Sequence, residues 1–143
     1  MEPDPERIAA WLENLGGERR GERAWVVRVP STKRGALAVL VSLGERTLSL
    51  RAFYMRGPDR RHEQVYRRLL RKGLEPSAWR FALDDGGDIH LLARAPLAGL
   101  SEDALDRLLG SCAAQVDETW EGVLRTGFEV PEGTVVAPPP GED

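Results

Sequence analysis

Residues that build most catalytic and metal centres are scarce in this sequence of 143 residues. It has one cysteine, Cys112, and two histidines, His62 and His90. A single cysteine excludes an intrachain disulfide and favours a reducing compartment. The zinc-protease motif needs a second histidine four residues after the first, and Tyr66 occupies that position. We therefore predict a protein that is not an enzyme and that has no metal site and no cofactor.

Long hydrophobic runs are missing as well. The longest uncharged run, residues 35–44, has ten residues, half of the roughly 20 that a membrane helix needs. The N-terminal sequence MEPDPERIAA is acidic and lacks the apolar core of a signal peptide. We expect a cytoplasmic protein without membrane association.

Basic residues are absent from the last fifteen positions. Residues 129–143 carry four acidic side chains, whereas the rest of the chain has 20 basic and 19 acidic residues. The segment is also rich in proline, glycine and small residues, and so it cannot bury enough apolar area to fold. We predict one folded domain over residues 1–128 and a disordered tail over residues 129–143 that folding does not require.

The rest of the sequence has the periodicity of an α+β domain. Alternation of apolar and polar residues predicts five strands, over residues 24–29, 36–43, 47–55, 79–84 and 88–95. Apolar residues at three-and-four spacing predict three helices, over residues 5–15, 59–72 and 102–125. The charged residues 18–23 are expected to be loop. The order α-β-β-β-α-β-β-α, with tight hairpin turns and no phosphate loop, predicts an antiparallel five-stranded sheet with helices packed on it.

The central unit of this pattern is a strand followed by a basic helix, over residues 47–73. Asp59 is expected to cap the helix, and Gly73 is expected to end it in a left-handed conformation. An apolar stripe should face the core, formed by His62, Val65, Tyr66, Leu69 and Leu70. Cys112 lies on the apolar stripe of the last helix, and so we expect a buried packing residue rather than a catalytic thiol.

Seven basic and two acidic residues lie between Arg56 and Lys72, and two interpretations of this surface stay open. It is either a solvated helix face with an internal Glu63–Arg67 pair, or a surface that binds nucleic acid or another anionic ligand. The candidate residues are Arg60, Arg61, Arg67, Arg68 and Arg71. The surface of the last helix is acidic, which favours pairing between protein surfaces.

Two segments resemble one family, the actinobacterial branch of YbjN-domain proteins. They are FYMRGPDRRHEQVYRRLL, residues 53–70, and GDIHLLARAPL, residues 87–97. His90 stands where a tyrosine is usual in that branch, and Gly73 where an asparagine is frequent. The resemblance implies the fold of type III secretion chaperones, whose element order is the one predicted above. It also implies a homodimer that binds other proteins, and it implies no particular biochemical activity.

We therefore predict a chaperone-like or regulatory protein-binding module that acts as a homodimer. The sheet face that carries Phe53 and Met55 is the expected interface, because contiguous apolar patches mark interaction sites. Leu40 and Leu92 extend this patch if the strand register allows it. In such a dimer the basic helix would face the acidic last helix of the second copy. Binding of nucleic acid or an anionic ligand through the basic helix is the alternative function.

Overall fold

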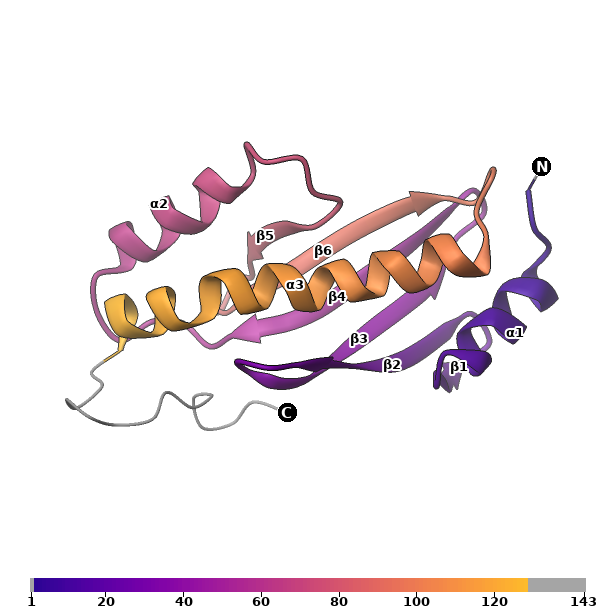
Figure 1. Cartoon of the computed structure of the whole chain (residues 1–143), viewed down its shortest axis with the longest axis horizontal. Coiled ribbons are helices and arrows are strands. Elements are labelled where there is room, and N and C mark those ends of the chain that lie inside the picture. The colour runs from indigo at the N-terminus through magenta and orange to yellow at the C-terminus, as the bar shows by residue number, and fades with distance from the viewer. Residues whose placement is uncertain (1, 129–143) are drawn as a thin grey trace.

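The computed structural model describes residues 2–128, which form an α+β domain with an antiparallel sheet. The predicted tail, residues 129–143, lies outside the described residues. The described elements, shown in Figure 1, are α1 (Pro5–Asn14), β1 (Glu18–Gly21), β2 (Ala24–Ser31), β3 (Gly35–Leu43), β4 (Thr47–Met55), α2 (His62–Lys72), β5 (Arg80–Leu83), β6 (Ile89–Pro96) and α3 (Glu102–Gly127). None of the helices within residues 2–128 combines the length and the hydropathy that crossing a bilayer requires.

The sheet has six strands in the order β1-β2-β3-β4-β6-β5, one more than predicted. The additional strand β1 comes from the charged segment predicted to be loop. It pairs with β2 through Glu18 opposite Val26 and Arg19 opposite Trp25. All four β1 residues are exposed, and so the sequence has no alternation of apolar residues from which this strand could be predicted. Backbone hydrogen bonds to β2 form it, and the Arg19 guanidinium lies 4.9 Å over the Trp25 ring.

The helices cover one face of the sheet. α3 runs across the middle strands, and α1 and α2 lie beside its two ends (Figure 1). The helix caps follow the sequence at two of the three starts: Asp4 accepts from the Arg7 N–H at 2.8 Å, and Ser101 accepts from the Ala104 N–H at 3.1 Å. Pro5 follows Asp4 at the first helical position, where its missing N–H costs nothing.

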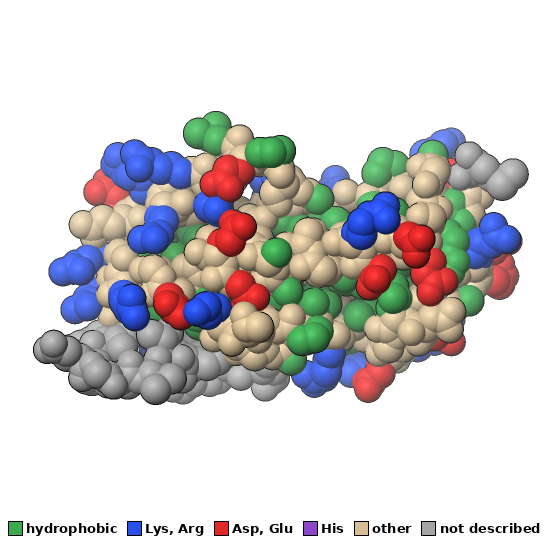
Figure 2. Space-filling view, viewed as in Figure 1, with side chains coloured by type: hydrophobic (Ala, Val, Ile, Leu, Met, Phe, Trp, Pro, Cys, Tyr) green, Lys and Arg blue, Asp and Glu red, His purple; other side chains and the backbone are tan. Residues whose placement is uncertain are grey.

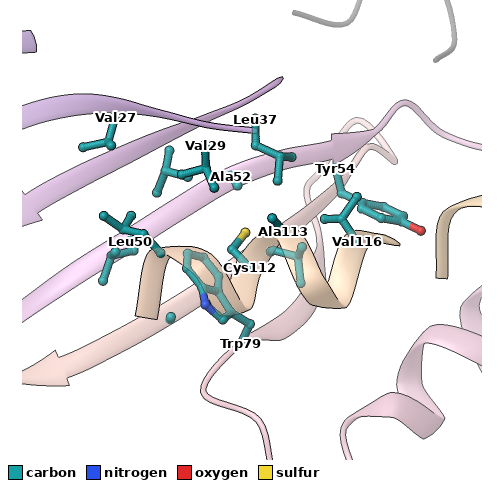
Figure 3. Close-up of a cluster of buried hydrophobic side chains, with 14 of the residues drawn as sticks. Val27, Val29, Leu37, Leu50, Ala52, Tyr54, Trp79, Cys112, Ala113 and Val116 are labelled. Atoms are coloured by element: carbon teal, nitrogen blue, oxygen red, sulfur yellow. The ribbon is translucent and has the colours of Figure 1, made fainter. Parts of the chain in front are cut away.

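The core lies between α3 and the inward side of β2, β3, β4 and β6. Cys112 points from α3 into a cluster of strand side chains that includes Val29 and Leu50 (Figure 3). Toward the end of β4, Tyr54 packs edge-on against Trp120, with ring centroids 5.3 Å apart, and its hydroxyl lies 2.8 Å from that of Thr119. The alternation predicted for β2 and β4 is confirmed, because Trp25, Val27, Leu48 and Leu50 are all buried.

The start of α2 differs from the prediction. Asp59 does not cap the helix, which begins at His62 after Arg61 in a left-handed conformation with φ 51°. The Asp59 carboxylate instead accepts a hydrogen bond from Arg56 at 2.8 Å, and its backbone N–H donates to the Gly127 carbonyl at 2.8 Å. A Cβ on Gly127 would lie 2.8 Å from the Pro58 Cβ, and so only glycine lets this loop pack against the end of α3. The loop is held by α3 rather than by a local cap.

Three further details of α2 also differ. His62 and Leu70 were expected on the buried stripe but are exposed, whereas Val65 and Leu69 are buried as predicted. The buried stripe of α2 is therefore narrower than the sequence pattern indicates. Gly73 follows the helix with φ −64°, and so the predicted left-handed stop is wrong. Gly73, Leu74 and Glu75 instead continue as successive turns.

A polar clamp fixes the β2–β3 loop to α3. The Asp117 carboxylate accepts hydrogen bonds from the Ser31 hydroxyl at 2.6 Å, the Lys33 N–H at 3.1 Å and the Thr32 hydroxyl at 3.0 Å. Partial burial alone would raise the pKa of Asp117, but these hydrogen bonds together outweigh burial and lower it. Arg34, which follows Lys33 in the β2–β3 loop, is 4% exposed and donates hydrogen bonds to the carbonyls of Tyr54 and Ala36.

We expect Asp117→Asn to lower the free energy of unfolding by about 1–2 kcal/mol at neutral pH, because an amide cannot accept all of these bonds. A lowered native pKa stabilises the fold above the unfolded pKa, near 3.8, and this contribution is lost as the pH falls through the native value. The difference between wild type and variant should therefore shrink in acid. Urea unfolding followed by tryptophan fluorescence at several pH values measures it. Asp106→Asn, an exposed position on α3, is the control, and an equal loss there would contradict the clamp.

Candidate interaction surfaces

The seven residues predicted to bind a partner do not form one site. Met55 was expected beside Phe53 on the outward sheet face, and this is wrong: Met55 is 0% exposed. A β-bulge between Phe53 and Met55 shifts the register so that Met55 pairs with Ile89 and turns into the core. Phe53 does lie on the outward face, half-buried and edge-on to His90 at 5.4 Å.

The five candidate arginines of the basic helix have different surroundings. Arg60 donates to the Phe128 carbonyl at 3.1 Å, and so it closes the C-terminal end of α3. The Arg68 guanidinium lies directly against Gly122 of α3. Arg61, Arg67 and Arg71 are exposed, and Arg67 lies 3.8 Å from Glu63 in a loose helical pair. All five arginines are exposed, but among the described residues Arg60 and Arg68 also contact α3, whereas no contact with α3 is seen for Arg61, Arg67 and Arg71.

The basic and acidic helices meet within one chain. Figure 2 shows basic side chains gathered over α2 and acidic ones along α3. Lys72 of α2 donates to Glu118 of α3 at 3.0 Å and to Glu75 at 3.1 Å. Lys33 donates to Glu121 at 2.7 Å, which raises the pKa of the lysine. Part of the charge complementarity that was expected between two copies is therefore satisfied inside a single copy.

An apolar groove between α2 and β5 was not predicted. We call it the leucine groove; it has a volume of about 240 Å³ and is lined by Tyr66, Leu69, Leu70, Phe81, Ala82, Leu83 and Ile89. Leu70 is 72% exposed and Leu83 is 53% exposed, on opposite sides of the groove. Leu74, just past the end of α2, is 89% exposed. Figure 2 shows hydrophobic side chains standing at the surface after α2. The sequence signal was the pair of adjacent leucines, since only one of them can face α3.

The sheet face away from α3 is the second uncovered surface. We call it the open sheet face; the outward residues of its four central strands include Val26, Arg28, Ala38, Leu40, Arg51, Phe53, His90, Leu92 and Arg94. Leu40 and Leu92 flank Arg51 in one cross-strand row, and both are about two-fifths exposed. The register, which the sequence left open, brings Leu40 and Leu92 onto the face of Phe53.

A histidine–aspartate pair lies at one margin of the open sheet face. His90 Nε2 is 2.7 Å from an Asp84 carboxylate oxygen. The hydrogen bond from His90, together with the N–H groups of Asp88 and Gly86, lowers the pKa of Asp84. The other contacts of His90 are with Arg51 and Phe53. Because no nucleophilic side chain takes part in these contacts, the pair is explained by closure of the β5–β6 turn.

The described residues offer little metal or thiol chemistry. Residues 2–128 contain no cluster of three or more His, Cys, Asp or Glu side chains that could hold a metal ion. Cys112 is fully buried, and this burial raises the pKa of its thiol to about 12. A reactive cysteine needs an exposed and electropositive environment, which Cys112 lacks, and so its prediction as a packing residue is confirmed.

Residues 4–124 match the family model "YbjN: Putative bacterial sensory transduction regulator". The chain belongs to the YbjN family. Two mycobacterial proteins are similar to this chain. The uncharacterised protein ML2442 of Mycobacterium leprae is 36% identical over 103 residues, which cover 72% of this chain and 56% of that protein. The uncharacterised protein Rv0487 of Mycobacterium tuberculosis is 33% identical over 105 residues, covering 73% and 57%. The chain thus spans little more than half the length of these relatives.

Solved structures share the fold at low identity. The type III secretion chaperone SycH of Yersinia pestis, in complex with a fragment of YscM2, has a TM-score of 0.58 at 21% identity, covering 78% of this chain and 95% of SycH. The ExsC–ExsE complex has a TM-score of 0.62 at 17% identity, covering 85% and 96%. YbjN from E. coli has a TM-score of 0.55 at 13% identity, covering 84% and 93%. The predicted secretion-chaperone fold is therefore confirmed.

The two segments that resemble YbjN proteins contact each other in the fold. The Gly57 N–H donates to the Asp88 carboxylate at 2.9 Å, which joins the end of β4 to the β5–β6 turn. A Cβ on Gly57 would lie 2.9 Å from the Gly87 carbonyl oxygen, and Gly87 itself has φ +91°. These motif residues therefore have a structural role in bringing two loops together.

We expect Cys112→Ala to lower the free energy of unfolding by about 1 kcal/mol, because it removes a buried sulfur and leaves a small cavity. Chemical denaturation measures this loss. In the native wild type, a thiol reagent at neutral pH should react slowly with Cys112. It should reach the rate of an exposed thiol only after denaturant is added. Rapid labelling of the native protein would contradict burial of the thiol.

Proposed function

We propose that this YbjN-family chain is a non-catalytic module that binds other proteins, with a chaperone-like or regulatory role, and that it acts as a homodimer through the leucine groove. The observation that supports this most is the uncovered apolar surface of α2 and β5. Each of Leu70, Leu74 and Leu83 is more than half exposed to water. Burying one leucine completely is worth about 1.5–3 kcal/mol. An apolar surface of this kind on a soluble chain is typical of an interface.

The related folds support the protein-binding part of the proposal. The SycH, HopA1–SchA and ExsC–ExsE structures are complexes of such a fold with a protein partner. The family model describes a regulator, which is compatible with a module that acts by binding. We propose that the protein is located in the cytoplasm, a reducing compartment in which a single cysteine such as Cys112 stays reduced.

Self-association is better supported at the leucine groove than at the Phe53 face. A twofold interface brings the same patch of both copies together. On the open sheet face this would bring together two patches that each carry Arg28, Arg51 and Arg94, and the juxtaposition of like charges is destabilising. The leucine groove has an apolar lining instead, and Arg67 and Arg71 line an adjacent hollow together with Glu63 and Leu70.

Binding of nucleic acid through the basic helix is the less supported alternative. Arg60 and Arg68 are engaged with α3, and Lys72 is paired with Glu118. Arg61, Arg67 and Arg71 are the candidate arginines without a contact to α3 within residues 2–128. If nucleic acid were the ligand, random-sequence RNA would bind with an affinity that falls steeply with salt. We expect RNA binding no stronger than that of a variant with Arg67→Gln and Arg71→Gln.

Light scattering on the purified chain tests the dimer. At micromolar concentration we expect twice the 15.8 kDa mass of one chain. Leu70→Asp should raise the dimer dissociation constant by about tenfold or more, because each copy places a charge in the apolar groove. Because Leu70 is exposed, we expect the Leu70→Asp variant to fold, and circular dichroism checks that it does.

Leu40→Asp is the matched control, since it places the same charge on an exposed leucine of the open sheet face. We expect it to leave the dimer mass unchanged. A dimer that separates with Leu40→Asp or Phe53→Asp, but persists with Leu70→Asp, would place the interface on the open sheet face. A chain that stays a monomer at high concentration would refute the homodimer altogether.

A further inference from the structure

The four central strands of the open sheet face carry charge of one sign, and the Asp84 carboxylate at its margin is bonded to His90. Strands β2, β3, β4 and β6 contain no aspartate and no glutamate, and their outward residues include Arg28, Arg51 and Arg94. None of these three arginines forms an ion pair within residues 2–128. Arg80 extends the charge onto β5, where it pairs in register with Leu92. The face therefore carries uncompensated positive charge on a rigid sheet.

Apolar side chains alternate with these arginines. One cross-strand row reads Leu40, Arg51, Leu92 and Arg80 from β3 to β5. Side chains in such a row stand about 5 Å apart. Phe53 and Arg94 flank the row along β4 and β6. A ligand that fits this surface needs acidic groups for the arginines and aliphatic groups for the leucines.

We propose that the open sheet face binds the acidic segment of the same chain, residues 129–143. That segment has Glu129, Glu132, Glu142 and Asp143, and no basic residue. It also has Val135 and Val136 in its middle. The segment thus supplies carboxylates for the arginines of the face and aliphatic side chains for its leucines. Both sets of groups belong to the same chain.

The point where the described chain ends favours this occupant. Phe128 is 5% exposed, and the Arg56 guanidinium lies 4.5 Å over its ring. Arg56 directly follows β4, three residues after Phe53 of the open sheet face. The described chain therefore ends beside Arg56, the residue that follows a central strand. The fifteen residues of the segment can span about 50 Å, whereas a strand of nine residues is about 30 Å long.

Covalent linkage makes weak contacts sufficient. Each exposed arginine–carboxylate pair contributes little alone, but a tethered segment acts at an effective concentration on the order of millimolar. The arrangement would make the segment a competitor for any acidic protein partner that approaches the same face. It is independent of the homodimer proposed above, which uses the leucine groove.

Other occupants fit the face less well. Single-stranded nucleic acid binds through several aromatic side chains on which bases stack. Phe53 and His90 are the aromatic residues here, they contact each other edge-on, and the remaining apolar groups are aliphatic. A second copy of the face would bring its own arginines against those of the first.

A spin label locates the segment in the full-length chain. Gly141→Cys provides one accessible thiol, since Cys112 is fully buried and does not react in the native protein. A nitroxide at position 141 broadens the amide signals of nearby residues. At low salt we expect broadening of the outward residues of β4 and β6, Arg51 and Leu92 among them. High salt should reduce it, because exposed charge pairs are screened.

Two charge-matched variants identify the surface. In the labelled chain, Arg51→Gln with Arg94→Gln should at least halve the relaxation enhancement on β4 and β6. Arg67→Gln with Arg71→Gln removes the same charge from α2 and should leave it unchanged. Circular dichroism confirms that both variants fold. The proposal would be overturned if only the variant with Arg67→Gln and Arg71→Gln lost the relaxation enhancement on β4 and β6. It would also be overturned if the labelled chain showed no such enhancement at low salt.

A mixing experiment separates cis from trans binding. Spin-labelled Leu70→Asp chain without isotope is mixed with Leu70→Asp chain that carries nitrogen-15 and no spin label, because mixed dimers of the wild-type chain would bring the nitroxide of one copy near the other. We expect no broadening of the open sheet face in this mixture beyond that caused by free nitroxide. Broadening as strong as in the singly prepared sample would show that the segment binds a second copy, and this would overturn binding within one chain.

Discussion

The structure depends on one packing arrangement, in which α3 lies along the inward face of β4 and its neighbours. Trp120, Cys112 and Thr119 of α3 meet Tyr54 and the aliphatic side chains of the sheet. Because α1 and α2 are placed at the ends of the same face, none of the helices within residues 2–128 covers the remaining face of the sheet (Figure 1). Both candidate interaction surfaces follow from this one-sided arrangement.

The loops that carry the family motifs hold this arrangement together. The loop after β4 contacts the end of α3 through Asp59 and Gly127, and it contacts the β5–β6 turn through Gly57 and Asp88. At the same end of the sheet, Asp117 holds the β2–β3 loop to α3, and Arg34 of that loop donates to the Tyr54 carbonyl near the end of β4. The residues that identify the family are thus mainly residues that join elements, and they explain the shared fold more directly than any shared activity.

The two surfaces differ in chemistry, and this separates their proposed roles. The leucine groove is apolar and lies between an α-helix and an edge strand, a geometry suited to a second copy or another protein. The open sheet face combines arginines with leucines and is suited to an acidic segment. A module with one surface for assembly and one for a charged segment is compatible with a regulatory or chaperone-like binding protein of the YbjN family.

The sequence by itself determined the element types, the antiparallel sheet and the family. Period-two alternation in β2, β3 and β4 and three-and-four spacing in α3 are strong because each element buries one face against the same core. The caps at Asp4 and Ser101 are local interactions, and so they too could be predicted. The buried state of Cys112 follows from its place on the apolar stripe of α3.

Only the tertiary structure decided the features that depend on distant contacts. β1 forms because β2 offers an edge, although its own four residues are charged or glycine and all exposed. The bulge that buries Met55 depends on pairing with Ile89, 34 positions later in the chain. The orientation of α2, which leaves Leu70 outside and assigns Arg60 and Arg68 to α3, is set by where α3 ends. Periodicity reports which face of an element is apolar, but the neighbour that covers that face is a property of the whole fold.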